Sequence, residues 1–126
     1  MEIKARELKE LNDTIRELLP LQLNINLSYK IACIAREIRE KQNMVDTLKE
    51  ELIETYAKKD EKGMTLISGE GVVEIDKKDA AELSKQLNNL MARNIEINIE
   101  KIKLDDILDL NLTIGQITSL LPLIEK

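Results

Sequence analysis

Hydrophobic residues recur along this chain with two different periods, and each period predicts a different kind of element. The longest pattern covers residues 28–57, where apolar residues return at three- and four-residue steps, broken at Lys41 and Thr55, with no Gly or Pro between them. Since an α-helix has about 3.6 residues per turn, this spacing predicts one uninterrupted helix, with Ser28 as its N-cap. Its apolar seam consists of Ile31, Ile34, Ile38, Val45, Leu48 and Leu52.

A shorter helix is predicted on the N-terminal side of this long one. Residues 2–18 keep a helical spacing of apolar positions, apart from one longer gap between Ile3 and Leu8. Pro20 prevents this helix from continuing, because it lacks an amide hydrogen and restricts the backbone of the residue before it.

Three more helical segments are predicted towards the C-terminus. Residues 77–91 place apolar side chains on one helix face, and residues 104–110 suit a helical turn. Thr113 and Gln116 have the spacing of a capping box, which predicts a short final helix ending at Pro122.

Two segments alternate strictly between apolar and polar residues. Residues 21–27 (LQLNINL) and 95–100 (IEINIE) each predict a strand with one wet face, and their likeness predicts that they pair in one small sheet. Residues 64–75 predict a short hairpin around a glycine-containing loop, after a polar turn that ends at Gly63. The expected fold is α+β and mainly helical, in a single domain over residues 1–126, with the long helix packed on shorter helices.

Composition narrows the choice of function. The 126 residues carry a net charge of −5 and include no Phe or Trp, so leucine and isoleucine must fill the core. No basic stripe or set of stacking aromatics is present, and nucleic-acid binding is therefore not expected. No apolar run approaches transmembrane length and no signal-peptide pattern opens the chain, so we expect a cytoplasmic protein without a membrane partner.

The chain lacks the side chain that enzymes most often use as a general base. The chain has no histidine, which excludes Ser–His–Asp and Cys–His nucleophiles. Cys33, the single cysteine, lies inside a helical pattern, and we expect a buried structural thiol. No catalytic residue, metal site or cofactor is predicted, and the chain is not expected to be an enzyme.

One helix face offers a candidate ligand site. Tyr29 and Arg36 lie at similar azimuths, away from the apolar seam, with Arg39 at the margin of this face. Tyrosine and arginine favour stacking and anion contacts, so the three side chains are candidates for binding a small nucleotide or a partner protein. The alternative is an ordinary charged helix surface.

Several short motifs give the chain a family resemblance. They are SYKIA (28–32), YAKKDEKG (56–63), NIEINIEKI (94–102) and the tail LLPLIE (120–125). Over residues 21–126 the chain resembles a family of small proteins of tailed phages and prophages of low-GC Gram-positive bacteria. The resemblance implies a bacteriophage protein made in the cytoplasm of an infected or lysogenic host, and it carries no site residues with it.

Two classes of function follow. The first is a counter-defence protein that binds a host immune protein or sequesters a small nucleotide signal. The alternative is a structural, scaffold-like or assembly-chaperone protein of the phage. In either class the apolar seam predicts a homo-oligomer. The repeat of LLPL at 18–21 and 120–123 supports neither class, and we attribute it to coincidence.

Overall fold

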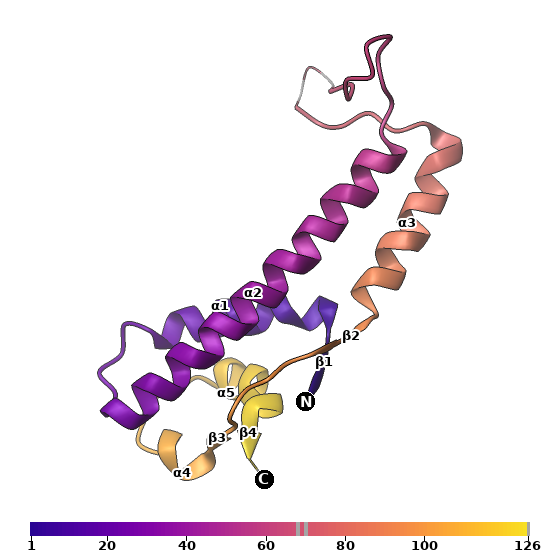
Figure 1. Cartoon of the computed structure of the whole chain (residues 1–126). Coiled ribbons are helices and arrows are strands. Elements are labelled where there is room, and N and C mark those ends of the chain that lie inside the picture. The colour runs from indigo at the N-terminus through magenta and orange to yellow at the C-terminus, as the bar shows by residue number, and fades with distance from the viewer. Residues whose placement is uncertain (68, 70, 126) are drawn as a thin grey trace. The chain divides into compact units, whose positions relative to one another are not determined.

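The computed structural model describes residues 1–67, 69 and 71–125, and its fold is α+β and mainly helical, as predicted. The chain forms two compact units, which are unit 1 (Met1–Asn43 with Asn94–Lys126) and unit 2 (Met44–Arg93). The prediction of a single domain stays a prediction. In chain order the elements in Figure 1 are β1 (Glu2–Lys4), η1 (Ala5–Glu7), α1 (Leu8–Leu18), α2 (Ile25–Tyr56), α3 (Lys77–Met91), β2 (Asn94–Glu96), β3 (Ile102–Lys103), α4 (Leu104–Ile107), α5 (Ile114–Leu120), η2 (Leu121–Leu123) and β4 (Ile124–Glu125).

The long helix α2 is uninterrupted, which confirms the prediction, but it begins three residues before Ser28. The amide of Leu27 donates a hydrogen bond of 2.9 Å to Oδ1 of Asn24, and the amide of Ser28 donates to the Asn24 carbonyl at 2.9 Å. Asn24 therefore caps the helix, and Ser28 lies inside its first turns. The residues up to Asn43 belong to unit 1, and those from Met44 belong to unit 2.

The prediction of a strand over residues 21–27 is wrong. The segment passes from a turn into the first residues of α2. Leu27 is 3% exposed whereas Ile25 is 83% exposed, so alternate residues do not share a face. The physical reason is that Leu27 lies four residues before Ile31 and extends the buried helical stripe, and this burial overrides the alternating pattern.

The prediction for residues 95–100 holds only for its first residues, and the predicted partner is wrong. Strand β2 pairs antiparallel with β1, and Ile95 lies opposite Ile3, with both side chains buried. The first helical segment therefore starts after Lys4, and residues 2–4 form a strand. A second pair, β3 and β4, is parallel, with Ile102 opposite Ile124.

Polar contacts attach the last helix of unit 1 to the first. The capping box of α5 is present as predicted, with hydrogen bonds in both directions between Thr113 and Gln116. Nε2 of Gln116 also donates to Glu17 at 2.7 Å, and Oγ of Ser119 donates to Glu10 at 2.9 Å. These bonds fix the side of α5 that faces α1 and leave its other side free of α1.

In unit 2 the end of α2 is joined to α3 through three short antiparallel segments. The predicted hairpin at 64–75 is confirmed by pairing of Ile67 with Val73, although its loop residues 68 and 70 lie outside the described residues. Residues 57–59 pair with both arms, which the sequence did not predict. Gly63 turns the chain with a φ of +80°, a conformation that L side chains rarely adopt.

The correction at residues 21–27 gives a first test. A strand would place Ile25 and Leu27 on the same face, whereas the helix buries Leu27 alone. We expect Leu27→Ala to lower the free energy of unfolding by about 2–5 kcal/mol, because it leaves a cavity. Ile25→Ala, the matched control, is expected to change it by less than about 0.5 kcal/mol. Denaturant unfolding measures both, and equal losses would argue for the strand.

A second test concerns the end of α2. Glu54 accepts hydrogen bonds from Nζ of Lys59 and, at 2.6 Å, from Oγ1 of Thr65. These bonds lower the pKa of the Glu54 carboxyl from its usual 4.5. The stabilisation is therefore present above pH 4.5 and is lost as the pH falls through the lower pKa of the folded state.

We therefore expect Glu54→Gln to lower the melting temperature at neutral pH. The difference from wild type should shrink as the pH falls below 4.5 and through the lower pKa of the folded state. Glu50→Gln removes an exposed carboxylate of the same helix without these contacts and serves as the control. A deficit of Glu54→Gln that persists unchanged in acid would contradict this assignment.

Candidate functional site

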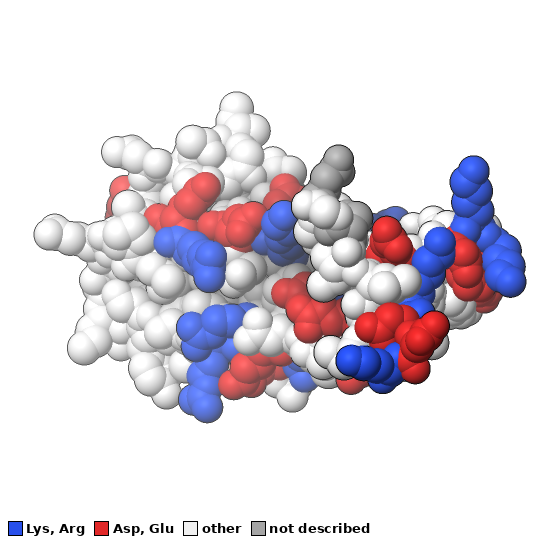
Figure 2. All heavy atoms as spheres, turned by 90° about the horizontal axis from the view of Figure 1, so that it is seen from above, with Lys and Arg blue, Asp and Glu red and all other residues white. Residues whose placement is uncertain are grey.

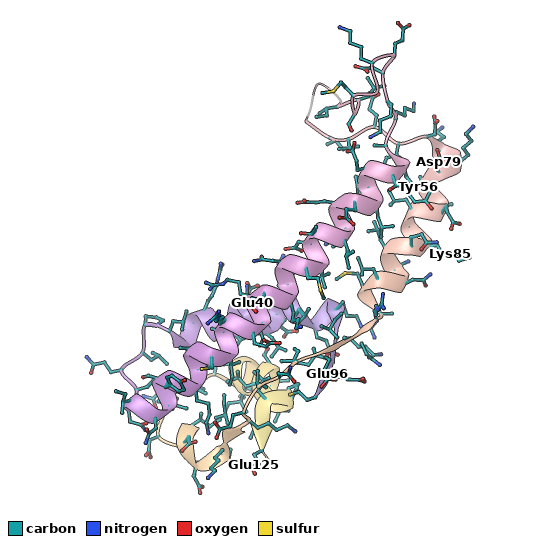
Figure 3. All side chains as sticks on the ribbon, in the orientation of Figure 1. Glu40, Tyr56, Asp79, Lys85, Glu96 and Glu125 are labelled. Atoms are coloured by element: carbon teal, nitrogen blue, oxygen red, sulfur yellow. The ribbon has the colours of Figure 1, made fainter. Side chains whose placement is uncertain are left out.

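The three predicted ligand residues lie on the solvent side of α2 in unit 1, but the structure does not gather them into one site. Tyr29 is exposed and borders a shallow hollow with Ile25, Asn26, Lys30 and Glu100. Arg36 lies beyond that hollow and forms an ion pair of 3.2 Å with Glu40, which Figure 3 labels. Arg39 is exposed. It does not line this hollow, and it is not part of the ion pair between Arg36 and Glu40.

The cations near Tyr29 are already matched by carboxylates. Nζ of Lys30 lies 3.7 Å from Glu100 and 3.8 Å from Asp106. Since a nucleotide phosphate would have to compete with these acidic partners, the positive potential at this face is small. Figure 2 shows the same mixture more widely, with acidic and basic side chains interspersed over the face in view.

The predicted oligomer seam divides into two parts. Ile31, Ile34, Ile38 and Val45 are at most 2% exposed within the chain itself, so they present no surface to a second copy. Leu48 and Leu52 are half-buried and line a groove in unit 2. Self-association through the whole seam stays a prediction, and only the second part has surface left for it.

Two further features bear on chemistry. Cys33 is exposed, so the expectation of a buried thiol is wrong. It lies two residues after Ile31 and one before Ile34, on the part of the helical turn that faces away from the buried stripe. Among the described residues, no three or more Cys, Asp or Glu side chains are grouped as metal ligands, and no helix is long and apolar enough to cross a membrane.

A further hollow in unit 1 was not predicted from the sequence. It has a volume of about 790 Å³ and lies where β1, the start of α4, α5 and the C-terminal segment meet. Its apolar lining includes Leu104, Ile117 and Leu121, which are 52%, 41% and 56% exposed. Met1, Pro122 and Ile124 complete that lining, and the charged residues around it are Glu2, Lys101 and Glu125.

The position of α5 explains why this hollow stays open. One side of the helix is bonded to α1 through Gln116 and Ser119, as described above, and Leu120 is fully buried. Ile117 and Leu121 are four residues apart and therefore lie on one face, which points into the hollow. The helical spacing of Ile117 and Leu121 could be recognised in the sequence, but their exposure could not be predicted from it.

The hollow has the composition of a contact surface for apolar groups. Large apolar side chains line most of it, and it lacks a cationic cluster, because the acidic residues Glu2 and Glu125 line it together with Lys101. Apolar surface that remains exposed in this way is typical of sites that bind another molecule.

Comparisons with known proteins give no independent indication of function. No family model matches the chain, and no curated protein or solved structure matches it either.

Proposed function

We propose that this chain is a non-catalytic binding protein whose unit 1 hollow takes up apolar side chains of a partner protein. The observation that carries the proposal is the exposure of Leu104, Ile117 and Leu121 around one hollow. Removing apolar area from water contributes about 25 cal/mol per Å², and such side chains are the usual anchors of protein contacts.

A protein partner fits this surface better than a small nucleotide does. A protein that sequesters a nucleotide needs unpaired cations beside a stacking side chain. Lys30 and Arg36, in contrast, each form ion pairs with carboxylates. The net charge of −5 also opposes an anionic ligand. Apolar contacts suffer neither disadvantage, because their strength does not depend on the charge of the chain.

The resemblance to phage proteins supplies the setting for this proposal. In an infected bacterium, a protein that binds a host immune protein counters defence by occupying its target, and this requires affinity rather than chemistry. The second candidate is an assembly or scaffold-like role in the phage, in which the partner is a phage protein. The groove in unit 2, which offers a second apolar surface to another chain, favours it.

The test uses two isoleucines of α5. Ile117 lines the hollow, whereas Ile114 is exposed on the same helix outside it. The tagged wild type and the variants Ile117→Asp and Ile114→Asp are used to capture proteins from infected and uninfected host cells. The captured partner is then purified and titrated against each form.

We expect wild type and Ile114→Asp to bind the partner alike, and Ile117→Asp to bind it at least about tenfold more weakly, because a carboxylate would be buried among apolar side chains. Circular dichroism and melting temperature should be unchanged in both variants. A host partner supports counter-defence, and a phage structural partner supports assembly.

Equal binding by all three forms would reject the hollow as the contact surface. Calorimetry against cyclic dinucleotides and ADP-ribose-type nucleotides tests nucleotide sequestration directly. Heat that is lost in an Arg36→Ala, Arg39→Ala double variant would overturn the proposal in favour of nucleotide sequestration.

A further inference from the structure

The hollow in unit 1 is bordered by the free edge of a strand. β1 forms a two-stranded sheet with β2, so its other edge has no strand partner in the part of the chain that the structure describes. Met1 and Glu2, at the start of β1, line the hollow, whereas no residue of β2 does. A hollow above the face of the sheet would be lined by both strands. This hollow therefore lies along the edge of β1 that points away from β2.

The hydrogen bonds between the two strands fix which backbone groups point to that edge. The amide of Ile97 donates to the carbonyl of Met1 at 2.8 Å, and the nitrogen of Met1 donates to the carbonyl of Ile97 at 3.2 Å. Bonded and non-bonded pairs alternate in an antiparallel ladder, so Glu2 and Glu96, which lie opposite each other, form a non-bonded pair. The backbone N–H and C=O of Glu2 therefore point away from β2, and the N–H of Lys4 does so for the same reason.

These backbone groups select the conformation of the occupant. An α-helix bonds its own N–H and C=O groups internally, so it can present only side chains to an edge strand. An extended segment has free backbone groups at the spacing of a strand and forms main-chain hydrogen bonds with the edge. Its side chains alternate between two faces, so every second one can meet the apolar lining of the hollow.

The charges at the hollow select the composition of that segment. Its charged residues are two glutamates, Glu2 and Glu125, and one lysine, Lys101. All three are exposed, and none of them takes part in an ion pair among the described residues. The carboxylates outnumber the ammonium group, and the net charge of the whole chain is also negative, at −5. A segment that carries lysine or arginine beside its apolar residues therefore has the complementary charge.

We propose that the occupant of the hollow is an extended segment of the partner protein, with alternating apolar residues and basic residues beside them, which adds a strand to the free edge of β1. Its apolar side chains contact Leu104, Ile117 and Leu121, and its basic side chains lie near Glu2 and Glu125. The inference rests on the proposed function, because it specifies the partner of the same hollow.

The first test selects ligands without assuming a partner. A display library of random peptides of about twelve residues, roughly twice the usual length of a strand, is selected against the full chain. We expect the enriched peptides to alternate apolar and polar residues and to contain lysine or arginine. They should bind Ile117→Asp at least about tenfold more weakly than wild type. The Glu2→Gln, Glu125→Gln double variant should also bind them more weakly. Glu50→Gln, an exposed control outside the hollow, should bind them like wild type.

The second test asks whether the peptide backbone pairs with β1. Each amide nitrogen of an enriched peptide is methylated in turn, which removes one hydrogen-bond donor at a time. Pairing along one edge predicts that binding weakens about fivefold or more at every second position and changes little between them. In the complex the amide of Lys4 should exchange its hydrogen with solvent more slowly than in the free chain.

The outcomes separate this inference from the proposed function. The added strand is overturned by enriched peptides whose apolar residues recur at three- and four-residue steps, by methylation losses without a period of two, or by unchanged exchange at Lys4. In each of these cases weaker binding to Ile117→Asp would still support the hollow as the contact surface. Enrichment of acidic peptides would overturn the charge assignment. Peptides that bind wild type and Ile117→Asp equally, or a library without enriched peptides, would overturn both the inference and the proposed function.

Discussion

Leu27, Ile31, Ile34 and Ile38 form one stripe on the first part of α2 and are almost entirely removed from water. A lone helix exposes every side chain, so the burial of this stripe requires that other segments of the chain cover it. Each such side chain contributes about 1.5–3 kcal/mol on burial. Because the chain has no Phe or Trp, these branched aliphatic side chains supply a larger share of the buried apolar area than they would in a core with aromatic residues.

Sustained helical spacing and the local hairpin could be read from the sequence, and the short pairings between distant segments could not. The continuity of α2, the extent of α3 and the capping box at Thr113 all follow from local pattern. Strand β1 has three residues, which are too few to show a period, and its partner lies at least ninety residues away. The one local sign of this strand in the sequence was the longer gap between Ile3 and Leu8 in the helical spacing. Likewise, whether Ile117 or Leu120 is exposed depends on where α1 bonds to α5, which no local pattern contains.

The distribution of charge supports the proposed binding of apolar groups over the binding of an anionic nucleotide. Lys30 lies between two carboxylates and Arg36 beside a third, so the surface near Tyr29 has little net field. Three exposed apolar side chains, Leu104, Ile117 and Leu121, instead line one hollow in unit 1. Without histidine, the chain also lacks the side chain best suited to proton transfer at neutral pH.

The pairing of β1 with β2 has a consequence for the order of folding. Unit 1 is assembled from two stretches of chain, and the whole of unit 2 is inserted between them. During synthesis β1 has no partner until Glu96 has been made. Until then Ile3 remains unpaired in a partly folded chain. The contacts of unit 2 are closer in sequence and form with a smaller loss of loop entropy. The pairing of β1 with β2 is therefore expected to form after the local contacts of the inserted unit, and unit 1 closes last.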